Sequence, residues 1–287
     1  MKVATPRQEK IAAAYYTDIW PLVPQRAAEA ILRQVLSFPV ATGGVKVLEV
    51  GAAAGLLTLH LAERMDYASH LVGVDPSPAL IERAETARQQ HPAGKKISFG
   101  VGDQPPPLSP EGSEPGYDLV ISNLALGDAP DPGAAIAELA RAVKPGGRLV
   151  ITVPLRGSWT EFLDLYADVL TDQGKREGLA ALNAYRSGLP DAEMAVTWLE
   201  RAGFTNVAVE VDRWELLFKS AREFFYAPII ELGPLAAWKQ IAGGRGDEMQ
   251  DVFFFVKEAI DTYFADTVFS VSVVIGCLRG TKPGPAR

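Results

Sequence analysis

The sequence predicts an α/β protein built on a doubly wound, mostly parallel sheet of seven strands. The first observation is that short apolar runs bounded by turn residues alternate with segments whose apolar residues recur at helical spacing. The second is the length: 287 residues, 48% of them hydrophobic, are enough for a full core and one elaboration. Alternating strands and helices of this size connect by right-handed crossovers and place helices on both faces of the sheet.

The first strand, turn and helix occupy residues 46–65. KVLEV at 46–50 is a short apolar run, the turn GAAAG follows it, and residues 56–65 have helical periodicity. A helix at 25–36 precedes this unit, and Pro39 ends its pattern. The alternation then continues with strands at 70–75, 96–103, 117–126 and 146–154 and with helices at 78–90 and 132–143.

The pattern changes after residue 154. We expect helices at 159–170 and 191–202, a strand at 204–218, two helix-rich stretches within 219–266 and a closing strand at 267–278. This predicts three parts: an N-terminal helical lid segment (1–44), a core (45–218 and 267–280) and a helical substrate cap (219–266) inserted before the last strand. Nine of the 25 aromatic residues lie in 219–266. They form either the inner face of a substrate cavity or the packing between cap and core.

Composition narrows the class of partner. The formal charge of -7 and the pI of about 5.1 argue against nucleic-acid binding, so a small-molecule or protein-borne substrate is expected. The single cysteine, Cys277, excludes an internal disulfide, and the first ten residues lack the apolar segment of a signal peptide. No apolar run reaches the roughly 20 residues of a membrane span. We therefore expect a cytoplasmic protein with no membrane association and no metal site, and leave its oligomeric state open.

The turn after the first strand is the first candidate site. Glu49 ends the strand, Gly51 and Gly55 bracket the loop, and the next helix begins over the carboxyl edge of the sheet, where open α/β folds bind ligands. Asp75 follows Gly51 by 24 residues and ends the second strand, so its carboxylate can accept both hydroxyls of a ribose. The loop lacks the G-x-G-x-x-G spacing of dinucleotide sites, which favours a nucleoside without a pyrophosphate. A tight turn that only packs helix on strand is the alternative.

Residues 45–154 resemble the class I S-adenosylmethionine (SAM)-dependent methyltransferases, a family with a Rossmann-like core, an antiparallel last strand and, in many members, a helical cap. Five segments carry the resemblance in the family's order: EVGAAAG (49–55), GVDPS (73–77), VGDQPPPL (101–108), DLVISNLAL (118–126) and RAVKPGGRLVIT (141–152). The resemblance implies SAM as cofactor and S-adenosylhomocysteine (SAH) as product.

Carried over by position, the resemblance assigns a cofactor-binding set. In this assignment, Glu49 would orient the methionine end of the cofactor and the backbone at Gly51 would approach the cofactor closely. Asp75 would bind the ribose. Asp103, with Gln104 beside it, would bind the adenine. The full set is Glu49, Gly51, Ala53, Gly55, Asp75, Pro76, Gly102, Asp103, Gln104, Asn123 and Leu124. For Asp103 the alternative is a turn cap, and for Asn123 a hydrogen bond at the strand end. The family usually has glycine at position 53, so we predict an ordinary negative φ for Ala53, with Gly51 and Gly55 in the strained or closely packed positions.

Substrate residues are less clearly indicated. The segment at 15–32 resembles one that covers the cofactor in many small-molecule methyltransferases, which makes Tyr15, Tyr16, Trp20 and Gln25 lid or substrate candidates; a hydrophobic staple onto the sheet is the alternative. The layout is similar to the malonyl-carrier-protein methyltransferase subgroup, but Gly127 and Asp128 replace the usual Gln-Trp. Asp128 is a weak candidate for a catalytic base, because His60, His70 and His91 all lie in the cofactor half of the chain.

Two functions from different classes follow. The first is a SAM-dependent methyltransferase that transfers a methyl group by in-line displacement to oxygen, nitrogen or carbon of a small-molecule or carrier-bound acceptor. Positioning and exclusion of water supply most of the rate in such a reaction. The second is a non-catalytic SAM- or SAH-binding accessory protein of the same fold. A nicotinamide-dependent oxidoreductase is excluded by the loop spacing.

Overall fold

The computed structural model describes residues 4–36, 44–102, 116–129, 131–243 and 246–284. The chain divides into two compact units. Unit 1 comprises Met1–Val153, Ala192–Val211 and Gly276–Arg287, and unit 2 comprises Pro154–Asp191 and Asp212–Ile275. The sequence placed residues 154–191, 212–218 and 267–275 with the core, whereas these three segments lie in unit 2 of the structure.

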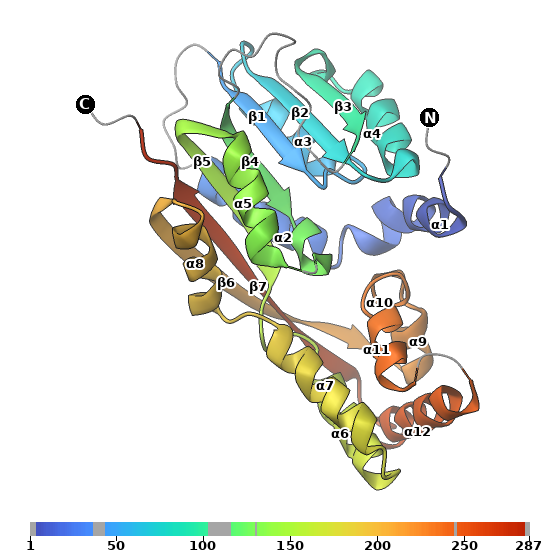
Figure 1. Ribbon diagram of the computed structural model, residues 1–287. Coiled ribbons are helices and arrows are strands. Elements are labelled where there is room, and N and C mark those ends of the chain that lie inside the picture. Colours follow the sequence, from blue (N-terminus) through green and yellow to red (C-terminus); the bar gives the residue numbers. More distant parts are fainter. Residues whose placement is uncertain (1–3, 37–43, 103–115, 130, 244–245, 285–287) are drawn as a thin grey trace. The chain divides into compact units, whose positions relative to one another are not determined.

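The seven strands form one sheet with the order β3-β2-β1-β4-β5-β7-β6, which confirms the predicted fold class (Figure 1). Their bounds are β1 Lys46–Val50, β2 His70–Asp75, β3 Ile97–Val101, β4 Tyr117–Asn123, β5 Val143–Pro154, β6 Thr205–Phe218 and β7 Phe269–Thr281. Strands β1 to β5 pair in parallel. The N–H of Lys282 donates to the carbonyl of Gly147, and the N–H of Leu155 donates to the carbonyl of Val274. The residue number of the bonded partner therefore falls from 282 to 274 as the number on β5 rises from 147 to 155. This direction of numbering makes β7 antiparallel.

Helices cover both faces of the sheet in unit 1. Their bounds are α1 Pro6–Ala14, α2 Pro24–Leu36, α3 Leu56–Arg64, α4 Pro78–Gln90, α5 Pro132–Ala142 and α8 Ala192–Arg201, with one turn of π-helix at Tyr15–Ile19. Helices α2 and α3 contact each other, as do α5 and α8, and α2 and α5 lie on opposite faces of β4 (Figure 1). The sequence predicted a helical segment over 1–44 but specified a helix only at 25–36, so α1 and the π-helix were not located individually.

Two of these helices begin at side chains that fix the chain's exit from the carboxyl edge. The Ser77 hydroxyl accepts the N–H of Leu80 at the start of α4, and the Asp131 carboxylate accepts that of Ala134 at the start of α5. Each cap is followed by proline at the first helical position, which has no N–H to leave unsatisfied. Because β1, β2 and β4 are parallel, Glu49, Asp75 and Asn123 reach the same edge of the sheet.

Unit 2 is built around a cluster of aromatic rings. Its helices are α6 Thr160–Asp172, α7 Arg176–Gly188, α9 Ala221–Tyr226, α10 Pro228–Glu231, α11 Leu235–Ile241 and α12 Asp247–Tyr263. Phe162 is fully buried against Trp238, with ring centroids 4.2 Å apart, and Phe224 lies 5.1 Å from Phe162 and 5.2 Å from Phe269. These buried rings of 219–266 therefore serve as the core of unit 2.

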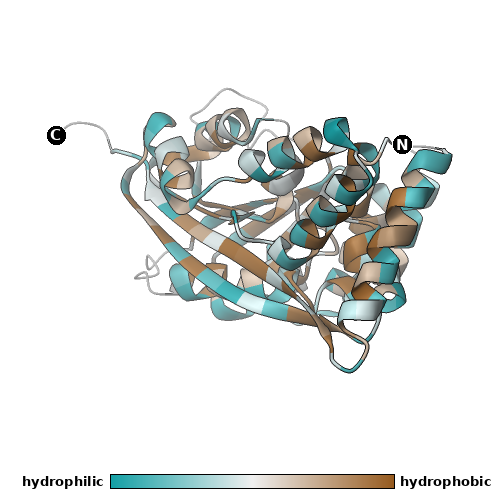
Figure 2. Ribbon diagram, turned by 90° about the horizontal axis from the view of Figure 1, so that it is seen from below, coloured by the Kyte–Doolittle hydropathy of each residue, from teal (hydrophilic) through white to brown (hydrophobic). Residues whose placement is uncertain are grey.

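The long strands β6 and β7 differ in exposure. β7 is buried along most of its length, whereas β6, at the edge of the sheet, alternates between exposed and more buried residues. The same contrast in hydropathy is visible along the two strands (Figure 2). An alternating, partly charged edge strand discourages pairing with another sheet. Within the described ranges, no helix is both long and apolar enough to cross a bilayer.

We predict that Phe224→Ala lowers the free energy of unfolding by about 3–5 kcal/mol, because it opens a cavity in the aromatic core of unit 2. Phe255→Ala is the matched control, since that ring is 41% exposed and its loss is expected to cost less than about 1 kcal/mol. Urea denaturation followed by circular dichroism measures both. Equal losses in the two variants would contradict this assignment of the core.

Candidate functional site

The loop between β1 and α3 takes an unusual backbone path. Gly51, Ala53 and Gly55 have φ values of 77°, 47° and 79°, so every second residue is in the left-handed region. The predicted negative φ of Ala53 was therefore wrong. The alanine takes the conformation that glycine adopts readily, at a steric cost of about 1–2 kcal/mol for a residue with a Cβ.

A carboxylate explains why Ala53 accepts this conformation. The N–H of Ala53 donates to Oδ2 of Asp75 at 2.9 Å, and the N–H of Ser77 donates to Oδ1 of the same residue at 2.9 Å. Hydrogen bonds to a charged acceptor are worth about 1.5–3 kcal/mol, enough to offset the strain. Asp75 thus joins the loop after β1 to the turn after β2.

Both bracketing glycines are required by space as well as by φ. A Cβ on Gly51 would lie 2.2 Å from the Cβ of Ala125, beyond β4, and a Cβ on Gly55 would lie 2.5 Å from Cζ of Phe99 on β3. The loop is therefore closely packed against its neighbours on both sides.

Glu49 is a buried acid at the end of β1. Its carboxylate accepts the hydroxyl of Thr58 on the first turn of α3. Burial raises the pKa of Glu49 to about 8, the Thr58 hydrogen bond lowers it, and the nearby charge of Asp75 raises it. The protonated form of Glu49 therefore predominates at neutral pH.

Asp75 and Tyr15 complete an acidic cluster around Glu49. Burial raises the pKa of Asp75, whereas the N–H bonds from Ser77 and Ala53 lower it. The pKa of the Tyr15 hydroxyl is raised by burial and then by the charges of Glu49 and Asp75, so this ring lies close to both acids. No lysine or arginine among the described residues contributes to the pKa of either carboxyl.

The N-terminal segment is tied to this edge by three contacts. The Tyr16 hydroxyl donates to the carbonyl of Ala54 at 3.1 Å, Nδ2 of Asn123 donates to the carbonyl of Pro24 at 2.9 Å, and the ring of Trp20 lies 6.3 Å from that of His60. Gln25, by contrast, is exposed, and its amide lies 3.4 Å from Glu29. The structure thus brings Tyr15, Tyr16 and Trp20 to the site and leaves the Gln25 side chain outside it.

Asn123 and Leu124 form the far side of the site with a residue that the sequence analysis missed. The Thr152 hydroxyl donates to Oδ1 of Asn123 at 2.8 Å and accepts the N–H of Leu124 at 3.0 Å, where Leu124 has φ 63°. Asn123 and Thr152 are partners in the β4–β5 register, so the pairing of these two strands is the signal that predicts the contact. Thr58 and Ser77 were missed because nothing in their local pattern marks them as partners of Glu49 and Asp75.

The other candidate residues from the sequence have few side-chain contacts in the described part of the structure, or lie outside it. Pro76 is exposed, and the N–H of Gly102 donates to the carbonyl of Asp75 at 2.9 Å. Asp103 and Gln104 lie outside the described residues. Asp128 ends the 3-10 helix Ala125–Asp128, but its side chain is not among those described.

Taken together, these residues suit a cationic ligand that also carries hydroxyl groups. A carboxylate has about four acceptor positions, and Asp75 uses two of them within the protein. Buried acids without a cation are electrostatically uncompensated, so a positively charged ligand binds them favourably. Among the described residues, no group of three or more potential metal ligands gathers.

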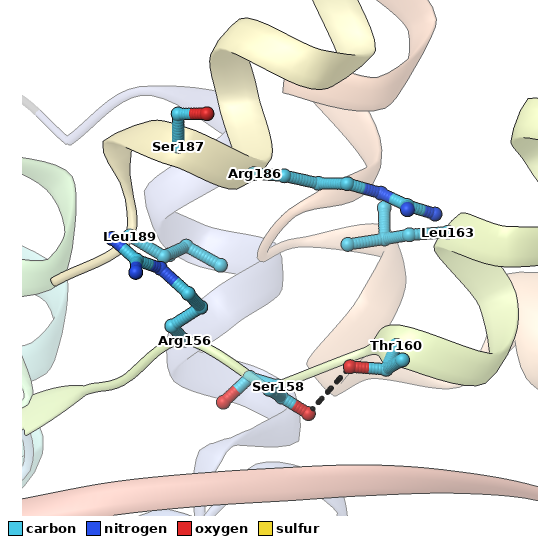
Figure 3. A pocket seen from close by; sticks show the side chains of 8 residues that line it. Arg156, Ser158, Thr160, Leu163, Arg186, Ser187 and Leu189 are labelled. Atoms are coloured by element: carbon cyan, nitrogen blue, oxygen red, sulfur yellow. Dashed lines mark hydrogen bonds between the residues drawn. The ribbon is translucent and has the colours of Figure 1, made fainter. Parts of the chain in front are cut away.

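Unit 2 contains a separate hollow of about 460 Å³ between the start of α6 and the end of α7 (Figure 3). Arg156 and Arg186 line it, with their guanidinium groups directed to different ends of the hollow (Figure 3). Arg186 lies 2.8 Å from Asp164, Arg156 lies 3.3 Å from Asp191, and the Thr160 hydroxyl donates to the carbonyl of Gly157. Each arginine that lines this hollow is already beside a carboxylate. The hollow therefore differs from the site in unit 1, where the buried acids have no such partner of opposite charge among the described residues.

Comparison with known proteins identifies a family. Residues 19–209 match the family model described as a methyltransferase domain. The malonyl-[acyl-carrier protein] O-methyltransferase of Brevibacillus brevis is 24% identical over 270 residues, which cover 92% of this chain and 90% of that protein. The ubiquinone biosynthesis O-methyltransferase of Xylella fastidiosa is 28% identical over 212 residues, covering 71% of this chain and 80% of that protein.

Solved structures share the fold. A SAM-dependent methyltransferase from Geobacter sulfurreducens, in complex with S-adenosyl-L-homocysteine, superposes with a TM-score of 0.54 at 15% identity, covering 98% of this chain and 100% of that one. A methyltransferase structure from Bacillus halodurans gives a TM-score of 0.53 at 17% identity and covers 90% of this chain and 99% of that one.

We predict that Ala53→Gly keeps the fold and changes the free energy of unfolding by between about 0 and +1 kcal/mol. Relief of the left-handed strain then slightly exceeds the added entropy of the unfolded chain. Ala52→Gly is the matched control: Ala52 is 4% exposed and has no positive φ, so its substitution is expected to cost about 1–2 kcal/mol. Chemical denaturation compares the two, and a loss for Ala53→Gly as large as that for Ala52→Gly would contradict the loop conformation.

We also predict that Glu49 makes the protein less stable as pH rises. Its pKa is about 8 in the folded chain and 4.5 in the unfolded chain, so the folded state binds the proton more tightly. The contribution of Glu49 to the free energy of unfolding is fully present below about pH 4.5. Between about pH 4.5 and pH 8 it decreases by an amount on the order of a few kcal/mol, and above about pH 8 it no longer changes. Glu49→Gln lacks this component, so its stability is expected to change less between pH 5 and pH 8. Parallel pH profiles for the two proteins would contradict the raised pKa.

Proposed function

Because this chain belongs to the methyltransferase-domain family, we propose that it transfers a methyl group to an oxygen atom of a small-molecule or carrier-bound acceptor. The enzyme is a SAM-dependent methyltransferase and SAM is its cofactor. The observation that carries the proposal is the pair of buried acids, Glu49 and Asp75, with no cation of the described chain to compensate them.

The residues of unit 1 fit this cofactor. SAM, when bound, supplies an electrophilic methyl group on a positively charged sulfur. Asp75 would hold the ribose through its two remaining acceptor positions, and Glu49 would face the methionine end.

The chain's contribution to the reaction is position and exclusion of water. Tyr15 and Trp20 are buried over the site, and the Asn123–Pro24 hydrogen bond holds the covering segment against β4. A covered site that keeps the acceptor oxygen in line with the methyl group supplies an entropic advantage without a covalent step.

None of the three histidines is placed as a general base. His60 packs against Trp20, His91 lies 3.0 Å from Glu63, and His70 lies 3.5 Å from the Ser98 hydroxyl. An acceptor carboxylate is already ionised near neutral pH and needs no base. We infer that the acceptor is a carboxylic acid or another acidic hydroxyl compound.

The relatives support this acceptor class. One is named for methylation of a malonyl group on a carrier protein and another for an oxygen in ubiquinone synthesis, and both names indicate transfer to oxygen. The acidic composition supports a substrate other than nucleic acid. A reducing cytoplasm is the proposed location, since the only cysteine, Cys277, is a buried free thiol.

The non-catalytic alternative loses its main support. It rested on Ala53 where the family has glycine and on Gly127 and Asp128 where the subgroup has Gln-Trp. Ala53, however, takes the left-handed φ and directs its N–H to Asp75. The loop therefore keeps the contact that organises the ribose site.

We predict that Asp75→Ala weakens SAH binding at least about 30-fold, because it removes both the ribose acceptor and the Ala53 contact. Asp66→Ala is the matched control, since Asp66 is exposed and bonds the N–H of Ala68 outside the site, and it is expected to bind SAH like the wild type. Isothermal titration calorimetry measures the affinities. Unchanged binding by Asp75→Ala would remove the proposed role of this residue.

The acceptor class is tested separately with methyl-labelled SAM. Malonyl-carrier protein, free dicarboxylic acids and phenols are offered in turn, and base-labile methyl ester in the product is expected for an acid acceptor. Label found only in base-stable ether, amine or carbon linkages would overturn the assignment to a carboxylic acid.

A further inference from the structure

We propose that unit 2 holds a second small-molecule site, a groove that binds an apolar carboxylic acid. The groove lies between α9 to α11 on one side and α12 on the other and has a volume of about 420 Å³. This volume is within the range typical of small-molecule pockets. The site lies in unit 2, and the inference does not depend on the methyl-transfer reaction.

The walls of the groove are apolar and partly exposed. Phe225 on α9 and Phe253 on α12 face each other with ring centroids 5.5 Å apart, and Leu235 is buried beside them. Tyr226 and Phe254, which also line the groove, are 72% and 56% exposed. Large apolar side chains gathered in one exposed groove mark a binding surface more often than a solvated one.

The charged groups of the groove favour an anion. Lys239 on α11 is partly buried in the lining and has no hydrogen bond or ion pair with any described residue. Lys257 on α12 also lines the groove, and its only ion pair with a described residue is one of 3.6 Å to Asp261. Glu231 is the one acid among the described residues that line the groove, so the net charge of the lining is positive.

These observations together select the occupant. The apolar walls favour a ligand with an alkyl or aryl body. The partly buried ammonium of Lys239, which has no partner among the described residues, favours a carboxylate at one end of that ligand. Acidic residues outnumber basic ones in unit 2, which disfavours an acidic protein as the partner and favours a compact acid that enters the groove itself. The cap predicted from the sequence therefore divides its rings between the buried core and this groove.

The test is calorimetric titration of the full chain with sodium decanoate below its micelle concentration and, separately, with decan-1-ol. Saturable binding of one decanoate per chain is expected. Lys239→Met is expected to weaken decanoate binding about fivefold or more and to leave decanol binding unchanged, because it removes the charge and keeps the apolar stem. Phe254→Asn is expected to weaken both ligands.

Lys219→Met is the matched control, since Lys219 is exposed on unit 2 and does not line the groove. It is expected to bind both ligands like the wild type. SAH titration and circular dichroism of each variant report the fold, and decanoate binding in a chain that fails to bind SAH would still support the groove. No saturable decanoate binding, or equal decanoate affinity in the wild type and Lys239→Met, overturns the proposal. Dimerisation that Phe254→Asn abolishes, without decanoate binding, identifies a second copy of the chain as the occupant and also overturns it.

Discussion

The carboxylate of Asp75 accepts one backbone N–H from the loop after β1, at Ala53, and one from the turn after its own strand, at Ser77. The loop is also held to β2 by the N–H groups of Gly51 and Ala52, which both donate to the carbonyl of Val74 at 2.9 Å. The first bond holds a non-glycine residue in the left-handed region, and the second sets the approach to α4, which begins at Ser77. A burial that raises the pKa of Asp75 is tolerated because these N–H groups stabilise its charge. The arrangement of the cofactor site follows from this one residue.

The neighbouring acid, Glu49, has no described cation beside it to compensate a negative charge. Among the described residues, Glu49 has Thr58 alone as a hydrogen-bond partner, and burial raises its pKa to about 8. The charge of Asp75 adds to this shift instead of relieving it, and the charges of both carboxylates raise the pKa of Tyr15. A protein that keeps two buried acids without a cation has an electrostatic preference for a cationic ligand, and SAM has both the positive charge and the hydroxyl groups that this site can accept.

Much of the core was predictable from the sequence because its signals are local. β1 and β2 have the predicted bounds, since apolar runs that end in turn residues leave little choice of register. Asp75 was identified because its position at the end of β2 depends only on strand order. Ala53 was predicted incorrectly because local preference for negative φ was overridden by a carboxylate 22 positions later in the sequence. Thr152 was missed for the same reason: its contact with Asn123 exists only once β4 and β5 are paired. The division into units was also beyond local pattern, because residues 154–191 join a core made by rings from 219–266.

Asp75 organises the loop 51–55 before any ligand is present, and amide hydrogen exchange tests this role most directly. In the ligand-free wild type, the Ala53 and Ser77 amides are predicted to exchange slowly. In Asp75→Ala both are predicted to exchange much faster, while the amide of Leu48 within β1 stays protected. Fast exchange of the Ala53 amide in the wild type, or equal protection in the variant, would contradict this role.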